Sequence, residues 1–323
     1  MHRRQFLGLA GATLAAGFST QARSQAQGWP NKPVKLILPY APGGATDLIG
    51  LPWADKLSQV FGQQFVIENR GGAGGMIGTE AAAKAAPDGY TFLLTPNATL
   101  SVLPNMRKTP YDPVKSFDPV ARVGDLVCGF VINPAVGPKT FQETIAYAKA
   151  NPGKLSYGSA GLGTSTHLRI EMLKYRAGID ILHVPYRGSA DALNDLLPNT
   201  VQMMNEINVL PHVKAGKLIL LDINYTERHP EFPDVPTLTE LGFPNSDVPI
   251  WYSVQAPTGT PKEIVATLNS KIVEIAKSEE MIARMRSINV VVPIQTPEEM
   301  TKHLLEDTAR NAEVIKAANI KLE

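Results

Sequence analysis

The sequence of 323 residues contains a single cysteine, Cys128. A single thiol cannot form an internal disulfide, and it cannot supply the ligands of a cysteine-rich zinc site. Neither sign of charge is in excess, because 31 basic and 30 acidic side chains give a formal net charge of +1. This balance excludes a strongly basic nucleic-acid binder, so no nucleic acid is expected as a partner. Cys128 lies in an apolar stretch, which predicts a buried structural thiol.

No run after the first 26 residues is apolar and long enough to span a bilayer, which takes about 20 residues. Residues 1–26 have the order of a secretory signal: a basic start, an apolar run and small residues near Ala22 and Ala26. Arg3 and Arg4 favour the twin-arginine type, and an ordinary export signal is the alternative. We expect the leader to be removed, leaving 28 basic and 30 acidic side chains, and the mature protein to be soluble in the periplasm.

Short apolar runs alternate with stretches of helical period along the rest of the chain. The predicted strands include residues 34–40, 65–68, 91–95, 130–133, 155–157, 181–186, 201–204 and 218–223, and the predicted helices 47–61, 79–86, 141–150, 165–177 and 190–197. This alternation predicts an α/β protein with largely parallel sheets. We expect two lobes, with residues 27–123 plus 251–323 forming the first and the inserted residues 124–250 the second.

Several helix starts are visible in the sequence. Thr140 with Glu143 matches a capping box, in which a hydroxyl and a carboxylate bind free backbone N–H groups. Thr260 with Glu263 has the same spacing. Both pairs predict the first turn of a helix.

Two glycine-rich loops follow predicted strands and run into predicted helices. The first spans Pro39 to Asp47, where Gly43 and Gly44 allow close approach to the backbone and the helix start offers free N–H groups. A tight turn without a ligand explains these residues equally well. The second spans Tyr157 to His167 and contains Thr164, Ser165 and Thr166 in a row. One hydroxyl must cap the helix, but three exceed that need and favour an anion site, particularly for a carboxylate.

A third glycine-rich segment, residues 69–78, fails as a dinucleotide fingerprint. With Gly72 and Gly74 in place, the third glycine would fall at Ile77. No cofactor is therefore expected. Metal-ligand motifs are also missing from the scattered histidines, so no metal site is expected. Ser159 lacks a nucleophile elbow, and we expect no catalytic residues and no enzymatic activity.

Several long segments resemble the Bug-type solute-binding receptors of tripartite tricarboxylate transporters. The resemblance is carried by WPNKPVKLILPYAPGGATDLIG, ENRGGAGGMIGTEAAAKAAPDGYTFLL, NPGKLSYGSAGLGTSTHL, HVPYRGSADALNDLL and APTGTPKEIVATLN, among others. It implies a two-lobed Venus-flytrap fold of the periplasmic binding protein type (type II-like). It also implies a small carboxylate held in the cleft by hinge closure, integral-membrane transporter subunits as partners, and a monomeric receptor.

The same resemblance implies which residues contact the ligand. They are Tyr40, Ala41, Gly43, Gly44 and Asp47 in the first loop, Ser159, Gly163, Thr164 and Ser165 in the second, and Thr95 and Asn97 as a cleft wall. Arg70 and Arg187 follow strand ends and are further candidates, with a solvated or paired surface charge as the alternative.

Two positions depart from the family pattern. An aspartate that often faces the cleft is replaced by a shortened segment around Glu206, which is expected either to substitute for the aspartate or to leave the ligand without that interaction. Met76 stands where asparagine is common. Both changes favour a less polar ligand, such as an aromatic carboxylate, beside the di- and tricarboxylates. A receptor for a membrane sensor kinase is the main alternative function, and a secreted serine hydrolase using Ser159 is a second.

Overall fold

The computed structural model describes residues 28–244, 246, 249–317 and 319–320. The expected leader, residues 1–26, lies outside the described residues, and so do both interpretations of its export type. Within the part of the chain that the structure describes, no helix combines the length and apolar character needed to cross a membrane.

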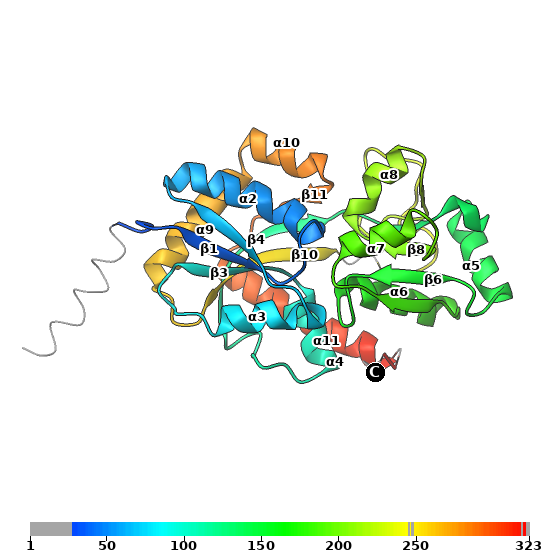
Figure 1. The fold of residues 1–323 in the computed structure, drawn as a ribbon, viewed down its shortest axis with the longest axis horizontal. Helices are drawn as coiled ribbons and strands as arrows, with labels where there is room; N and C mark the ends of the chain where they lie inside the picture. The colour runs from blue at the N-terminus through cyan, green and yellow to red at the C-terminus, as the bar shows by residue number, and fades with distance from the viewer. Residues whose placement is uncertain (1–27, 245, 247–248, 318, 321–323) are drawn as a thin grey trace, which may run out of the picture.

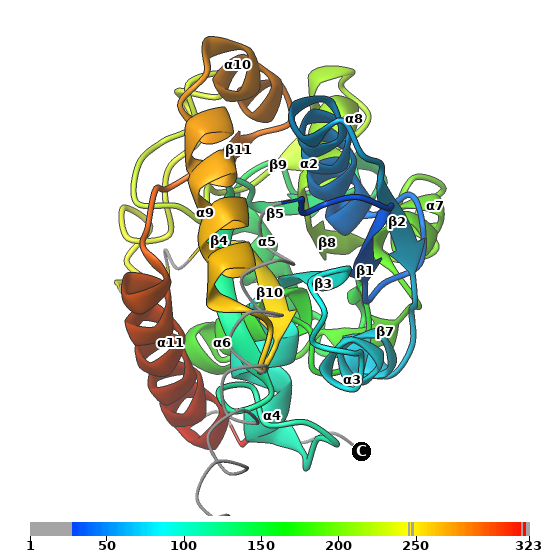
Figure 2. The ribbon, with the colours of Figure 1, turned by 90° about the vertical axis from the view of Figure 1, so that its left-hand side faces the viewer.

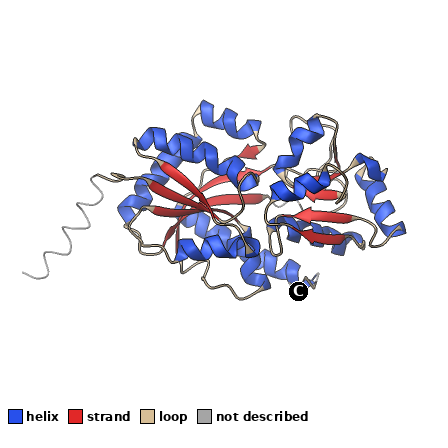
Figure 3. Cartoon of the chain, in the orientation of Figure 1, coloured by secondary structure: helices blue, strands red, loops and turns tan. Residues whose placement is uncertain are grey.

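Two separate sheets, each flanked by helices, divide the molecule into two lobes (Figures 1 and 3). The first lobe holds six strands in the order β11–β4–β10–β3–β1–β2. Their bounds are β1 Val34–Leu38, β2 Phe65–Asn69, β3 Thr91–Pro96, β4 Phe117–Leu126, β10 Ile250–Pro257 and β11 Val290–Val291. This sheet is built from both ends of the described chain, because the second lobe is inserted between β4 and β10.

Helices cover both faces of the first sheet. Their bounds are α2 Ala45–Phe61, α3 Met76–Ala83, α4 Leu103–Met106, α9 Lys262–Ala276, α10 Glu279–Ser287 and α11 Pro297–Ala317. One face packs against α2, α9 and α10 through a core that includes Trp53 and Leu268. The other packs against α3 and α11, where Met300 and Leu304 are buried beside Trp251. Figure 2 shows α2 and α3 on opposite sides of β1 and β3.

The second lobe has five strands in the order β7–β6–β8–β5–β9. Their bounds are β5 Phe130–Ile132, β6 Ser156–Ser159, β7 Leu182–Pro185, β8 Met203–Asn205 and β9 Ile219–Leu220. The helices are α5 Phe141–Ala150, α6 Ser165–Ala177, α7 Ser189–Leu196 and α8 Leu210–Lys214. A core with Phe130 and Tyr157 packs under α5 and α6, and a second core with Met204 packs under α7 and α8.

Both sheets are mixed, so the prediction of largely parallel sheets was wrong. The pairs β1–β2, β1–β3, β6–β7 and β6–β8 are parallel, whereas β10 is antiparallel to β3 and β4, and β5 is antiparallel to β8 and β9. The reason is the insertion. A chain that leaves a lobe along one strand returns along another in the opposite direction, and β10 is that returning strand.

The crossing segment between β4 and β5 packs closely against the chain that follows β9. A Cβ atom at Gly129 would lie 1.6 Å from the backbone oxygen of Asp222, so a side chain there is excluded. The backbone N–H of Asn224 donates to the Cys128 oxygen at 2.6 Å. Cys128 is fully buried, as predicted, and burial raises the pKa of its thiol to about 11.

The capping boxes predicted at Thr140 and Thr260 have different outcomes. The Thr140 hydroxyl accepts from the Glu143 N–H at 3.2 Å and begins α5, as predicted. Thr260 does not cap α9: its hydroxyl donates to the Pro257 oxygen, and the helix begins at Lys262. A local pattern offers a cap, but the preceding turn decides which partner the hydroxyl takes.

Candidate functional site

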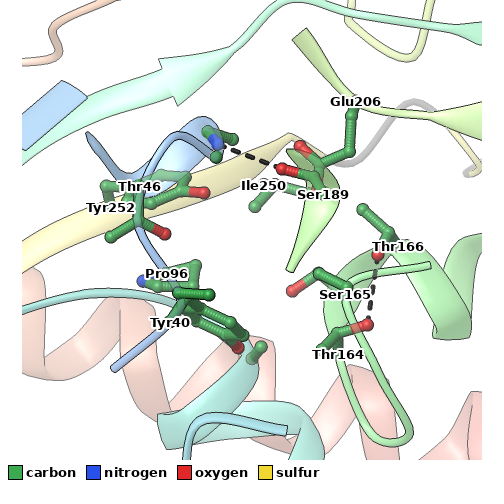
Figure 4. A pocket seen from close by; sticks show the side chains of 15 residues that line it. Tyr40, Thr46, Pro96, Thr164, Ser165, Thr166, Ser189, Glu206, Ile250 and Tyr252 are labelled. Atoms are coloured by element: carbon green, nitrogen blue, oxygen red, sulfur yellow. Dashed lines mark hydrogen bonds between the residues drawn. The ribbon is translucent and has the colours of Figure 1, made fainter. Parts of the chain in front are cut away.

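A narrow pocket lies between the lobes, where the carboxyl ends of β1, β3, β6 and β8 meet (Figure 4). Its lining residues are Tyr40, Ala41, Gly44, Ala45, Thr46, Pro96, Ala98, Ala160, Thr164, Ser165, Thr166, Ser189, Glu206, Ile250 and Tyr252. The cavity is only about 20 Å³, room for roughly a single water molecule. The two walls therefore lie close together here, and a larger molecule fits between them only when the lobes move apart.

The loop after β1 brings the free N-terminus of α2 to the pocket. Gly43 has φ +82°, a left-handed conformation that favours glycine, and Gly44 precedes the helix without a side-chain cap. The Ala45 N–H instead donates to the Ser189 hydroxyl of the second lobe at 3.1 Å. A Cβ atom at Gly44 would lie 2.9 Å from that hydroxyl oxygen. The glycines thus allow the two lobes to approach across this loop.

Asp47 lies behind the loop and does not line the pocket. Its Oδ1 accepts from the Asn69 side chain at 3.0 Å, and the same amide donates to the Tyr40 backbone oxygen at 3.2 Å. Asp47 Oδ2 is buried and has no hydrogen-bond partner within the described structure. Asp47 therefore links the β1–α2 loop to β2. It affects a ligand only indirectly, by holding this loop in position.

The second loop carries its hydroxyl groups to the opposite wall. Thr164 is the N-cap of α6: its hydroxyl accepts from the His167 N–H at 3.3 Å and donates to the Gly161 oxygen at 2.7 Å. The Ser165 hydroxyl donates across the cleft to Asn97 Oδ1 at 2.7 Å. Only one hydroxyl is needed as a cap, as predicted, so Ser165 and Thr166 remain directed to the cleft.

Ser159 and Gly163 support this loop from behind. Ser159 is fully buried, and its hydroxyl contacts His183 Nε2 at 2.7 Å, not His167. Burial lowers the pKa of His183 to about 3, so its imidazole is neutral and a weak base near pH 7. The Gly163 N–H donates to His167 Nδ1 at 3.3 Å. A buried serine paired with so weak a base does not favour the hydrolase alternative.

The predicted cleft wall at the end of β3 is formed by Pro96 and Ala98. These residues alternate along the chain with Thr95 and Asn97, the residues named from the sequence. Thr95 is fully buried and hydrogen-bonded to the Thr99 hydroxyl at 2.8 Å. Asn97 donates to Asp307 Oδ2 at 3.1 Å while it accepts from Ser165. Asn97 therefore links α11 and α6 beside the pocket.

Sequence reasoning missed one of the three helix N-termini at this pocket. Ser189 begins α7 directly after Gly188, in the short connection that follows β7. The same order of strand, glycine, hydroxyl and helix was present in HVPYRGS, so the signal was available. With α2 and α6, α7 places three positive helix ends at one point, an arrangement that suits an anion. In Figure 4 Ser165 and Thr164 face Tyr40 and Pro96 across the cavity.

The two candidate arginines do not line the pocket. Arg70 pairs with Glu68 on the surface, and Arg187 is exposed. Tyr252, from the returning strand β10, lines it instead. Its position depends on the insertion of the second lobe, which no local pattern reveals.

Burial of His167 should make the stability of the protein sensitive to acid. Burial lowers the pKa of His167 from 6.5 to about 4. Between these two pH values the unfolded chain therefore takes up a proton more readily than the folded chain. The stability that neutral His167 contributes is fully present above about pH 6.5 and is lost as the pH falls toward about 4. His167→Asn keeps an acceptor for Gly163. In urea unfolding from about pH 7 to 5, the wild type should lose about 2 kcal/mol more than this variant.

Above about pH 7 the two proteins should respond to pH in parallel, since His167 is neutral in both states there. An equal loss of stability in acid for both proteins would contradict this assignment.

Comparisons with known proteins agree with this architecture. The family model described as "Tripartite tricarboxylate transporter family receptor" matches residues 52–320. Protein BugT of Bordetella pertussis is 35% identical over 331 residues, covering 100% of both chains. The solved structure of R. palustris Rpa4515 with adipate is 32% identical with a TM-score of 0.87, covering 91% of this chain and 99% of that one. MatC of Rhodopseudomonas palustris with bound malate is 29% identical with a TM-score of 0.84, covering 89% and 100%.

Proposed function

Because the chain belongs to the tripartite tricarboxylate transporter receptor family, we propose that it captures a small carboxylate between its lobes and delivers it to a transporter of that class in the membrane. The observation that carries this proposal is the convergence of α2, α6 and α7, with hydroxyl groups from the second lobe, on one interlobe pocket. Helix N-termini and hydroxyl donors bind anions without a paired cation. The described residues lining the pocket include no lysine or arginine.

The neighbours support a carboxylate as the ligand class. The two R. palustris structures hold adipate and malate, both dicarboxylates. We infer that a ligand carboxylate of this chain contacts the backbone of Ala41 and Gly44 on one side and the hydroxyls of Thr164 and Ser165 on the other. Of the other residues predicted from the sequence, Tyr40 and Glu206 also line the pocket, and Gly43, Asp47, Thr95, Asn97, Ser159 and Gly163 position the loops.

Capture follows from the closed geometry. Direct interlobe hydrogen bonds from Ala45 to Ser189 and from Ser165 to Asn97 already hold the lobes together beside the pocket. A ligand that bonds to both walls gains free energy only in a form in which both walls reach it, so binding shifts the population away from the widely open form. We propose residues 27–123 plus 251–323 and residues 124–250 as the two moving bodies. They would act in the periplasm after removal of residues 1–26, as a monomer.

A thermal-shift screen tests the ligand class. Aliphatic di- and tricarboxylates, including adipate and malate, and aromatic carboxylates should raise the melting temperature when they bind. Neutral amides of the same shape should not. At about 1,000-fold excess over Kd a ligand stabilises the protein by about 4 kcal/mol, a shift of several degrees. A panel in which no carboxylate shifts the melting temperature would overturn the proposal.

Deleting the gene separates the transporter role from the sensor-kinase alternative. A transporter receptor is required for uptake of the radiolabelled ligand, so uptake should fall to background. A ligand-presenting receptor for a sensor would leave uptake by the existing transporter intact and remove only the transcriptional response.

A further inference from the structure

Glu206 is a buried carboxyl group in the wall of a pocket built for an anion. It follows β8, is 4% exposed and lines the cavity between the lobes (Figure 4). Its Oε2 atom is buried and has no hydrogen-bond partner within the described residues. An unsatisfied buried carboxylate oxygen is costly, so this atom needs either a donor or a proton.

The titratable groups around Glu206 provide little compensating charge. They are Arg169 from α6, Tyr40 from the β1–α2 loop, Tyr252 from β10 and Cys128 from the crossing segment. Burial raises the pKa of both tyrosines and of the cysteine, so these three are neutral near pH 7. Of the four, Arg169 alone is charged.

Arg169 is turned toward other acceptors. Its Nη1 donates to Asn205 Oδ1 at 3.1 Å, and it lies 3.5 Å from Asn224 Oδ1 and 3.5 Å from Cys128 Sγ. Asn224 in turn donates to Asp222. The guanidinium thus belongs to a buried network behind the pocket. Burial outweighs its attraction and raises the pKa of Glu206 to about 8.

A ligand carboxylate adds a second acid to the same small space. Two carboxylates held against each other in a narrow, water-poor pocket cannot both stay ionised, because their charges repel strongly there. One proton between them converts the repulsion into a hydrogen bond. The carboxylic acid O–H of Glu206 is available to donate it, since Glu206 lines the cavity and its Oε2 has no partner within the described residues.

Resting on the proposed function, we propose that Glu206 is the proton-bearing specificity residue of the pocket, which donates its carboxylic acid hydrogen to the bound carboxylate and so couples capture to proton uptake. Below the pKa of free Glu206 the proton is already present, and affinity does not depend on it. Above that pKa each binding event takes one proton from solvent, and affinity falls by about tenfold per pH unit.

Calorimetry with adipate and malate tests this coupling. At about pH 9 the binding enthalpy should differ between two buffers of different ionisation enthalpy, because the buffer supplies the proton, and at about pH 6 the difference should disappear. Adipate has no hydroxyl, so its binding isolates the acid–carboxylate contact. Glu206→Gln is the matched variant: its amide donates without a proton, so it should bind adipate with an affinity that does not change with pH.

A second measurement tests the protonation of Glu206 in the free protein and requires no ligand. The infrared carbonyl band of a protonated carboxylic acid should be present at about pH 7 and lost at about pH 10, beyond the range in which carboxyls remain protonated. Its absence at pH 7 would overturn the inference.

Three outcomes in solution are distinguishable. If neither adipate nor malate binds at any pH, the proposed capture of these dicarboxylates fails. If they bind with the same affinity at about pH 6 and 9, the function stands and the proton coupling is overturned. If Glu206→Gln loses malate but keeps adipate at every pH, ionised Glu206 accepts from the malate hydroxyl, which also overturns the inference.

Discussion

Replacing Gly74 with alanine should weaken ligand capture by about tenfold or more, while each lobe stays folded. Gly74 belongs to the glycine-rich segment that failed as a nucleotide motif, and its oxygen accepts from the Tyr40 hydroxyl at 3.1 Å. A Cβ atom there would lie 2.3 Å from the backbone oxygen of Leu162 in the second lobe. The segment is therefore a contact between the lobes. A methyl group opposes closure, and apparent affinity falls with the population of the closed form.

Gly216 provides a matched control. Its φ of +69° is the same as that of Gly74, but a Cβ atom at Gly216 would meet no atom within 4 Å. Alanine in this left-handed conformation costs about 1–2 kcal/mol at either site, so both variants should lose similar stability. Only Gly74→Ala should lose affinity, measured by calorimetry with the carboxylate that gives the largest thermal shift. Equal affinities for the two variants would show that capture does not need the closure seen in this structure.

Replacing Thr164 and Ser165 together with alanine should lower carboxylate affinity by at least about a hundredfold. Each hydrogen bond to a charged group contributes about 1.5–3 kcal/mol, and every 1.4 kcal/mol is a factor of ten. Ser165 should account for most of the loss, because Thr164 already uses its hydroxyl as the cap of α6. Ser165→Ala also removes the interlobe bond to Asn97.

The cap itself must be controlled, since losing it costs about 1 kcal/mol of stability in any helix. Thr140→Ala removes the equivalent cap from α5, and Thr140 does not line the pocket. It should destabilise the protein to a similar extent and leave binding unchanged. If the double variant binds with wild-type affinity in the same titration, the second loop does not contact the ligand.

The sequence by itself determined the parts of this protein that depend on near neighbours in the chain. Helix α6 runs from Ser165 to Ala177 as predicted, because a hydroxyl at Thr164 caps it and Gly178 ends it in a left-handed conformation. The glycines of the two loops, the buried thiol of Cys128 and the two-lobed α/β fold were also accessible. Each of these follows from local backbone preference, from burial of an apolar run, or from resemblance to the family.

The tertiary structure alone decided which side chains reach the pocket. Tyr252 enters because the chain crosses between lobes, and β10 returns against the direction of its neighbours for the same reason. Asn97 and Ser159 lie one residue away from lining positions, since side chains alternate in direction at strand ends. Glu206 becomes a candidate proton donor only through burial beside an arginine that is turned toward other acceptors. Such properties arise from contacts between segments distant in the chain, and no pattern of neighbouring residues encodes them.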